Sequence, residues 1–489
     1  MKLRVKPFKL AAGRPVAFVH ESDAAELKVY PSSRVRIRSN GISCLAIVDI
    51  VSGLFKPGSI ALSEEVLQVL PHARGGYVEV SFAERPESSM IIQKKIISKK
   101  YTEAELRTIV NDIVTNALTE AEISYFVSDV YRNSLSLQEI VYLTKAIAET
   151  GKRLKWHSSK IADKHSIGGI PGNRTTPIVV SICAAAGIIM PKTSSRAITS
   201  AAGTADVIES IARVDFKAEE LQRIVRKTGA CLAWGGALGL APADDKLIRV
   251  EKMINLDPEA QLIASILAKK LAMGSTHVLI DIPYGLGAKV SLARAKKLVR
   301  KFQTMGRLLK LHIRTVLTEG SQPIGNGIGP ILEIKDVIAV LRQENHPIDL
   351  EKKSVFLAGH VLELMGKASP GAGQSKARAI LASGAALRKF TEIIEAQHGT
   401  INHLPRAPLT KNIRATKSGT VVSIENRSIN YLGRLAGSPE DKTAGLYLVK
   451  RVHDVVKKGD ILFTIHSESS DKLAEAVRSL NHMVPMTIR

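Results

Sequence analysis

Hydrophobic and polar positions change their spacing along the chain, and the first change separates a β-rich segment from the rest. Up to about residue 86, short apolar runs alternate with clusters of Gly, Pro, Ser and Asn. The runs occupy residues 16–19, 35–37, 44–51 and 77–82. Apolar runs of this length between turn-forming residues predict a small β-rich N-terminal domain at residues 1–86.

The stretch from residue 86 to residue 100 is rich in lysine and has no clear period. Its lysines are Lys94, Lys95, Lys99 and Lys100. We expect a linker or an exposed basic turn there, because runs of like charge are usually solvated.

A helical period begins at Thr102. Apolar residues then recur at helical spacing, at Leu106, Ile109, Val110, Ile113, Val114 and Ala117. Three successive helices are expected to open with capping boxes, in which a hydroxyl residue precedes a carboxylate by three positions. The pairs are Thr102 with Glu105, Thr119 with Glu122, and Ser136 with Glu139. The pattern predicts a helical domain at residues 95–158, in which Gly151 ends the third helix.

Beyond this segment the pattern becomes strand, glycine-rich loop and helix, repeated at residues 188–209, 277–290 and 312–334. This alternation predicts an α/β domain with a mixed or largely parallel sheet over residues 160–400. After about residue 405 short apolar runs and the turn at residues 457–460 return, which predicts a small β-rich (α+β) subdomain at 405–489. Nothing in that last segment has the chemistry of a site, so we interpret it as a structural cap.

Composition narrows the class of protein. The chain has 489 residues, of which 45% are hydrophobic and 24% charged, which is typical of globular domains and excludes disordered and fibrous classes. Three well-separated cysteines, Cys44, Cys183 and Cys231, argue against a disulfide framework and a structural zinc site. The longest apolar stretch, residues 177–190, is too short to span a membrane, and the N-terminus lacks the apolar core of a signal peptide. We therefore expect a cytoplasmic protein without a membrane partner.

The charge points to an anionic partner. Lys and Arg number 69 against 46 Asp and Glu, which gives a formal net charge of +23. Such an excess fits either nucleic acid or a small phosphate-bearing substrate. A basic nucleic-acid-binding protein is thus one hypothesis, but aromatic residues make up only 4% of the chain and leave few platforms on which bases could stack.

Two loops carry the candidate chemistry. The first, residues 164–176, reads KHSIGGIPGNRTT and combines glycines with Lys164, Ser166, Thr175 and Thr176. Glycines let a backbone approach an anion, and hydroxyls and an ammonium donate to it, so this loop resembles a phosphate cradle, although an ordinary glycine turn is the simpler alternative. It matches neither a Walker A motif nor a dinucleotide fingerprint.

The second loop, residues 193–206, reads TSSRAITSAAGTAD and is unusually rich in hydroxyls. Such density disfavours both a helix and a buried strand, because hydroxyls compete for backbone hydrogen bonds. A polar ligand explains it better. Both loops are expected to follow strands, so they would converge at the carboxyl edge of one sheet, where α/β folds bind ligands.

These motifs resemble those of the thymidine and pyrimidine nucleoside phosphorylases. The run SSRAITSAAGTADVIE is similar to their signature, and KHSIGG is similar to their phosphate loop. Further matches follow at Arg249, residues 265–270 and Lys289. The resemblance spans about residues 95–489 and implies a helical domain, with a later contribution from about residues 241–272, facing an α/β domain across a cleft.

The β-rich N-terminal segment resembles the extension of one branch of this family, the archaeal AMP phosphorylases. That branch cleaves nucleoside 5′-monophosphates with inorganic phosphate, releasing the base and ribose 1,5-bisphosphate in nucleotide salvage and AMP catabolism. The resemblance implies no cofactor and no metal, phosphate as co-substrate, a homodimer or larger homo-oligomer, and no nucleic-acid partner. Thymidine phosphorylase, which yields thymine and 2-deoxyribose 1-phosphate, is the alternative activity.

The resemblance also assigns roles. The phosphate site corresponds to Lys164, Ser166, Ser194, Thr204 and Thr175 or Thr176, of which we assign Thr176. The nucleotide contacts correspond to Gly169, Ser195, Arg196, Ala197, Ile198, Thr199, Ser200, Thr204, Ser265 and Lys289, and the base-binding positions to Arg249, Ser265 and Lys269. The loop at residues 170–174 departs from the shorter Val-Gly-Asp stretch of thymidine phosphorylases.

The proton donor to the leaving base is Asp257 by resemblance, and His165 is a second candidate because imidazole titrates near neutrality. Each has a plainer interpretation: Asp257 also fits a helix N-cap, His165 could satisfy a loop carbonyl, and Lys289 could belong to a solvated basic surface. A further enzyme of the same fold, anthranilate phosphoribosyltransferase, is disfavoured because its Gly-Thr-Gly-Gly-Asp loop is absent here.

Overall fold

The structure is a computed structural model that describes residues 1–95, 100–197 and 200–489. The chain divides into two compact units. Unit 1 contains Met1–Gly151 and Ala241–Ala268, and unit 2 contains Lys152–Leu240 and Lys269–Arg489. Within the described residues, no helix is both long enough and apolar enough to cross a membrane.

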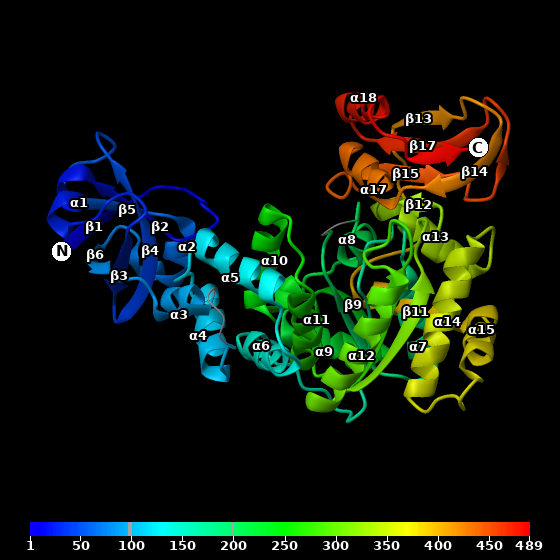
Figure 1. Cartoon of the computed structure of the whole chain (residues 1–489), viewed down its shortest axis with the longest axis horizontal. Helices are drawn as coiled ribbons and strands as arrows, with labels where there is room; N and C mark the ends of the chain where they lie inside the picture. The colour runs from blue at the N-terminus through cyan, green and yellow to red at the C-terminus, as the bar shows by residue number, and fades with distance from the viewer. Residues whose placement is uncertain (96–99, 198–199) are drawn as a thin grey trace. The chain divides into compact units, whose positions relative to one another are not determined.

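Unit 1 begins with a closed β-barrel of strand order β1-β5-β2-β4-β3-β6 (Figure 1). The strands are β1 (Lys2–Lys6), β2 (Val16–His20), β3 (Arg34–Ser39), β4 (Ile42–Val51), β5 (Ser59–Leu62) and β6 (Tyr77–Ala83), accompanied by α1 (Glu21–Leu27), α2 (Glu64–Val69) and the 3-10 turn η1 (Pro71–Ala73). Alternate residues of β1 and β6 point inward, so Leu3, Val5, Val78 and Val80 join one apolar core. The prediction that the N-terminal region is β-rich is confirmed.

Helices make up the rest of unit 1. They are α3 (Glu87–Lys95), α4 (Glu103–Val114), α5 (Glu120–Asn133), α6 (Leu137–Glu149), α10 (Pro242–Ile254) and α11 (Glu259–Ala272), whose last turn belongs to unit 2. All three predicted capping boxes are present, at Thr102, Thr119 and Ser136. They satisfy backbone N–H groups that the first helical turn leaves unbonded.

Residues 87–95 of the stretch that we expected to be a linker or an exposed basic turn form the helix α3 instead. Ile91, Ile92 and Lys95 are buried in it, and the Lys95 ammonium lies 3.0 Å from Glu105 Oε2. This ion pair explains how Lys95 can be buried, although its sequence context favours exposure to solvent. Lys94 is exposed as expected, and Lys99 lies outside the described residues.

The α/β part of unit 2 contains two parallel sheets. Strands β7 (Ala162–Ser166), β10 (His277–Tyr284) and β11 (His312–Glu319) form one in the order β11-β10-β7, and β8 (Met190–Ser194) pairs with β9 (Ala230–Trp234). The helices are α7 (Thr175–Ala185), α8 (Thr204–Glu209), α9 (Ala218–Thr228), α12 (Leu292–Leu308), α13 (Pro330–Arg342), α14 (Ile348–Leu364), α15 (Gly373–Ala382) and α16 (Ala385–Ala396), with the turn η2 (Gly236–Leu238). The predicted alternation of strand, loop and helix is confirmed.

The C-terminal subdomain shares a sheet with the α/β part (Figure 1). The short strand β12 (Gly327–Ile328) pairs antiparallel with β15 (Gly445–Leu448), and the sheet continues through β17 (Ile461–Ser467) to β13 (Leu409–Arg414). A second sheet joins β16 (Val455–Val456), β14 (Gly419–Ile424) and β18 (Met486–Ile488). Two helices, α17 (Asn426–Leu435) and α18 (Ser470–Ser479), complete this subdomain.

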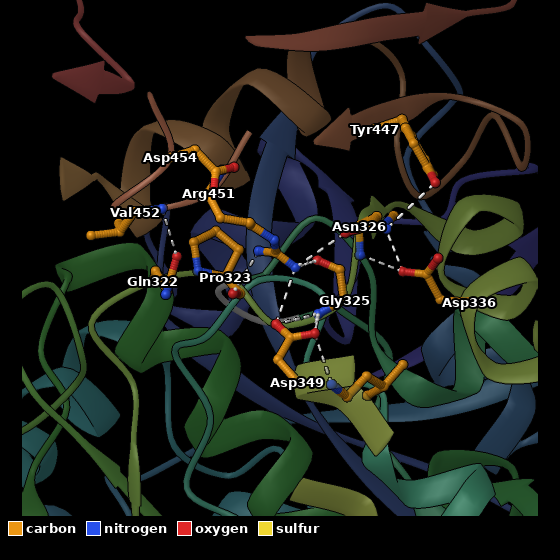
Figure 2. A network of polar contacts seen from close by, with 12 residues as sticks. Gln322, Pro323, Gly325, Asn326, Asp336, Asp349, Tyr447, Arg451, Val452 and Asp454 are labelled. Carbon is orange, nitrogen blue, oxygen red and sulfur yellow. Dashed lines mark hydrogen bonds and ion pairs between the residues drawn. The ribbon is translucent and has the colours of Figure 1, made fainter. Parts of the chain in front are cut away.

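Arg451 ties the C-terminal subdomain to the loop before β12, as Figure 2 shows. Its guanidinium donates to the carbonyls of Pro323 (2.9 Å) and Gly325, and to Asp349 Oδ2 at 3.1 Å. Asp336 holds the same loop from the other side, since its Oδ2 accepts from the amide of Asn326 at 2.6 Å. The loop in turn touches the glycine-rich loop after β7, because the amide of Ile324 donates to Pro171 O.

Replacing Arg451 with methionine should therefore destabilise the chain by about 2 kcal/mol, the typical effect of losing charged hydrogen bonds. The expected readout is a lower thermal unfolding midpoint. Arg434→Met, at an exposed position of α17, is the matched control and should leave the midpoint in place. Equal midpoints for the two variants would contradict the role of Arg451.

Candidate active site

The two glycine- and hydroxyl-rich loops meet, as the sequence predicts, but from two sheets rather than from one. The first follows β7 and the second follows β8, and these strands belong to different sheets. Arg174 joins the loops: its Nη1 donates to Thr204 Oγ1 at 2.6 Å and its Nη2 donates to Ala202 O at 2.9 Å. The convergence thus depends on side-chain contacts at the helix starts as well as on strand order.

Lys164 forms the base of this site. Its side chain points along the start of α7, where Nζ donates to Thr175 Oγ1 at 2.9 Å and to Thr176 Oγ1 at 3.4 Å. An ammonium can only donate, so both hydroxyls accept from it and keep their own hydrogens to donate elsewhere. Lys164 is 1% exposed, and burial lowers its pKa to about 8, against the opposing effect of the Asp281 carboxylate.

Ser166, at the end of β7, offers a further donor. Its Oγ is buried and has no hydrogen-bond partner among the described residues. Buried hydroxyls normally have one, so this atom is a candidate ligand for a bound anion. Lys164, Ser166, Thr175 and Thr176 therefore present a group of donors on one short segment.

Arg174 is a residue of the candidate site that sequence reasoning missed. Besides its bonds to the second loop, its Nε donates to Glu333 Oε2 at 2.6 Å. Because a guanidinium cannot accept, Thr204 Oγ1 receives a hydrogen from Arg174 and keeps its own hydrogen for another acceptor. Both ends of the Arg174–Glu333 pair are buried, with side chains 8% and 1% exposed. Arg174 lies within the motif at residues 164–176, but no pattern in the nearby sequence indicates that its partner Glu333 lies 159 positions away.

Buried charges of both signs lie behind the loops. Asp163 accepts from Lys270 Nζ at 2.8 Å and lies 3.6 Å from Lys192 Nζ. Burial disfavours its charge, but the two lysines hold the pKa of Asp163 below its ordinary value. Burial also lowers the pKa of Lys192 to about 7. A second pair joins Asp281 and Lys353 at 3.5 Å.

His165 is electrostatically unsuited to carry a proton. Loss of hydration, together with Lys270, Lys192, Lys269 and Lys164, sets the pKa of His165 well below its ordinary value. Its imidazole is therefore neutral near pH 7. It can donate or accept a hydrogen bond, but it is not a ready acid.

In the second loop, acidic residues engage the arginine that we assigned to substrate. Arg196 lies 3.2 Å from Asp206 and 2.5 Å from Glu209, and its guanidinium stacks over the ring of Trp234. Asp206 also accepts from the amide of Ala197 at 2.7 Å. These contacts of Arg196 stabilise the conformation of the loop.

Other residues of this loop are placed as follows. Ser194 ends β8 and is half-buried, Ser195 is exposed, and Ser200 Oγ donates to Ala202 O at 2.7 Å. Ile198 and Thr199 lie outside the described residues. Thr204 is the first residue of α8, so its hydroxyl stands at the start of that helix.

Gly169 and Lys289, both predicted to contact the nucleotide, are brought together. Gly169 has a φ of +93°, and a Cβ at that position would lie 3.3 Å from Lys289 Cβ. Only glycine suits both the backbone conformation and this close approach. Lys289 therefore stands at the rim of the loop after β7.

The remaining predicted residues lie on α10 and α11 or between them. Arg249 is exposed on α10, where Nη1 donates to Gly13 O at 3.1 Å. Asp257 is exposed and precedes the first residue of α11 by two positions. Ser265 and Lys269 are half-buried on α11, on either side of the division between the two units. In the described part of the chain, no group of three His, Cys, Asp or Glu residues could hold a metal ion.

Family models match most of the chain beyond the barrel. Residues 89–151 match the helical bundle domain of the glycosyl transferase family, and residues 158–387 match its a/b domain. Residues 420–487 match the pyrimidine nucleoside phosphorylase C-terminal domain. The matches lie in the order that the motifs predict.

Curated relatives match the full length. The AMP phosphorylase of Pyrococcus horikoshii is 47% identical over 100% of this chain and 98% of its own length, and that of Pyrococcus furiosus is 44% identical with the same coverage. The AMP phosphorylase of Natronomonas pharaonis is 43% identical over 97% of this chain and 95% of its own.

A solved structure, anthranilate phosphoribosyltransferase from Thermus thermophilus, shares the fold at a TM-score of 0.53 and 16% identity, over 63% of this chain and 99% of that one. Identity this low supports a common fold and no common reaction. Together, the family models and the full-length relatives show that the chain belongs to the pyrimidine nucleoside phosphorylase family of glycosyl transferases.

Proposed function

We propose that the protein is an AMP phosphorylase, which transfers the ribose 5-phosphate of a nucleoside 5′-monophosphate from its base to inorganic phosphate. The observation that carries the choice of a nucleotide is the match over 100% of this chain to AMP phosphorylases, because that match includes the N-terminal barrel. The family models begin only at residue 89 and would fit a nucleoside enzyme equally well.

The donors around Lys164 support phosphate as the nucleophile. Phosphate is already an anion near neutral pH and needs no general base, so the site must bind and orient it. Lys164 supplies charge, Ser166 has an unused hydroxyl, and Thr175, Thr176 and Thr204 hold hydroxyl hydrogens ready to donate. Orientation of this kind brings the phosphate oxygen to C1′ at little further entropic cost.

The balance of buried charge supports the same role. Lys164, Lys192, Lys270, Lys353 and Arg174 surround the carboxylates of Asp163, Asp281 and Glu333. Burial lowers the pKa of Lys164 to about 8 and that of Lys192 to about 7, so the charges of these two ammonium groups are incompletely compensated. A bound phosphate dianion would supply the missing negative charge.

Asp257 is the better candidate for the proton donor. Breaking the bond between C1′ and the base leaves an electron pair on the base nitrogen, which an acid must protonate as the oxocarbenium-like sugar meets phosphate. His165 is neutral because its pKa is so low. Asp257 is exposed in the free chain, and the resemblance to the AMP phosphorylase branch assigns it this role.

We assign Lys289 to the 5′-phosphate, which it would meet as a point charge. It adjoins Gly169 on the loop that holds the inorganic phosphate, so it adds a cation beside that site. Arg196 is committed to Asp206 and Glu209, so we assign it to loop shape rather than to direct phosphate contact. The base-side contacts stay with Arg249, Ser265 and Lys269 as predictions.

We propose further that the enzyme acts in the cytoplasm as a homodimer or larger homo-oligomer. Its three cysteines are free and buried, which suits a reducing compartment. The domain boundaries inferred from the sequence also stay predictions, with residues 241–272 assigned to the helical domain.

A substrate panel tests the proposed reaction. Purified protein is incubated with phosphate and AMP, CMP, UMP, thymidine or uridine, and release of free base is measured. We expect base from a monophosphate, in an amount equal to the phosphate consumed. Release from thymidine but from no monophosphate would make the protein a thymidine phosphorylase.

Replacing Asp257 with asparagine should lower kcat by about two to four orders of magnitude, the usual contribution of a general acid. Asp215→Asn, which makes the same change at an exposed carboxylate of the other unit, should retain activity. The unfolding midpoints of both variants should match the wild type. A kcat for Asp257→Asn within about twofold of wild type would return this residue to a capping role.

The pH dependence of phosphate use tests Lys164. Its ammonium is the form that attracts phosphate, and its pKa is lowered to about 8, so raising the pH through that value removes the charge. Above the break, kcat/KM for phosphate should fall about tenfold per pH unit. Lys164→Arg keeps its charge and should lack this break. Phosphate's own ionisation is common to both enzymes and cancels in their ratio. A wild-type profile that stays level to about pH 10, the ordinary range of lysine, would contradict the assignment.

A further inference from the structure

The helix α17 of the C-terminal subdomain presents one polar face to the loops of the predicted site. Asn426, Asn430 and Gly433 are buried residues of α17 spaced four and three positions apart, so they lie on the same side of the helix. Asn426 is 0% exposed and Asn430 is 4% exposed. Full burial of two amides is costly unless each finds hydrogen-bond partners.

Asn426 bonds to two different loops. Its Nδ2 donates to Gly320 O at 2.9 Å, in the turn after β11, and to Gly287 O at 3.3 Å, in the turn after β10. Both neighbours are carbonyl oxygens, which only accept, so the amide nitrogen must face them. Asn426 Oδ1 accepts no hydrogen bond within the described residues, so its polar contacts are confined to these two turns.

The two turns border the predicted nucleotide contacts. Gly287 precedes Lys289 by two residues, and Lys289 adjoins Gly169. A Cβ on Gly320 would lie 2.8 Å from Ile170 Cδ1, so this turn also touches the loop after β7. Displacing either turn therefore displaces a neighbour of the phosphate loop.

Asn430 bonds to the third loop. Its Oδ1 accepts from the amide of Ala201 at 3.0 Å, in the hydroxyl-rich loop after β8. One turn further along, a Cβ on Gly433 would lie 2.9 Å from Ala201 Cβ, so a larger side chain there would push the loop away. One helix face thus fixes three loops that approach the site from different strands.

We propose that Asn426 and Asn430 are positioning residues for the nucleotide, and that α17 holds the loops of Lys289, Ser200 and Thr204 in their binding geometry. This inference rests on the proposed function for its substrate, a nucleoside 5′-monophosphate. It changes the role of the C-terminal subdomain, which the sequence indicates to be only a structural cap. Lys164 and Thr176 lie on β7 and α7, which α17 reaches only through the turn at Gly320, so we expect the binding of inorganic phosphate to be affected less than that of the nucleotide.

Asn426→Asp is the sharpest variant, because it keeps the shape of the side chain and removes both N–H donors. A carboxylate would face two carbonyl oxygens, so the turns should separate from α17. We expect the KM for AMP to rise about tenfold, with kcat changed less than about twofold and the KM for phosphate changed less than the KM for AMP. Asn426→Ala, which adds no charge, gives the same test if the aspartate variant fails to fold.

Arg427→Gln is the matched control, since Arg427 is exposed on the neighbouring face of α17. Its kinetics should equal those of the wild type.

At the third loop, Asn430→Asp keeps an acceptor for the amide of Ala201, whereas Asn430→Leu removes it. The leucine variant should therefore raise the KM for AMP more than the aspartate variant.

Amide hydrogen exchange of the substrate-free chain separates this inference from the proposed function. In Asn426→Asp, residues 285–289 and 318–321 should exchange faster than in Arg427→Gln, whatever the substrate proves to be. Unchanged exchange there would show that Asn426 does not hold these two turns. Faster exchange with an unchanged KM for AMP would show that Asn426 does not position the nucleotide. A wild-type enzyme that cleaves no monophosphate would instead refute the proposed function. The exchange measurement would then still test whether Asn426 holds the two turns.

Discussion

The α/β part of this protein depends on buried positive charges that neighbouring carboxylates and hydroxyls stabilise. Lys164 is almost fully buried at the base of the predicted site, and its pKa falls to about 8 as a result. The ammonium persists there because Asp281 lies nearby and because its hydrogens reach Thr175 and Thr176. The same constraint accounts for Asp163 beside Lys192 and Lys270, since each buried cation needs an opposing charge.

This arrangement also explains how hydroxyls become ligands. A hydroxyl can donate or accept a hydrogen bond. When it accepts one from a neighbouring cation, its own hydrogen is directed to another acceptor. Lys164 and Arg174 each donate to a threonine in this way, the first at the start of α7 and the second at the start of α8. Glu333 holds Arg174 in place from a third helix. The donors of the site are thus oriented before the substrate binds, by the charges of Lys164 and Arg174.

Much of this was predictable from local pattern. The three capping boxes, the β-rich start and the glycine-rich loops after β7 and β10 follow from residues close together in sequence. The contacts of Arg174 with Glu333 and of Asn426 with Gly320 were not predictable, because partners more than a hundred residues apart leave no periodic trace. The helix α3 was mistaken for a linker because its buried lysine is neutralised by Glu105, which belongs to the next helix.

The C-terminal subdomain shows why such contacts matter for function. Its sequence has no catalytic motif, yet Arg451 holds the loop before β12 and α17 holds the turns after β10 and β11. A site built from several loops needs a rigid element that contacts them all. The residues assigned to phosphate and nucleotide account for only a few of the 69 Lys and Arg of the chain.

The central claim is that a nucleoside 5′-monophosphate is cleaved by phosphate rather than by water. Phosphorus-31 NMR of the wild-type enzyme with AMP and inorganic phosphate tests it most directly. The account predicts that the inorganic phosphate signal falls as adenine appears, while a pentose carrying two phosphate esters accumulates in equal amount. Adenine release with undiminished inorganic phosphate, or no release at all, would contradict it.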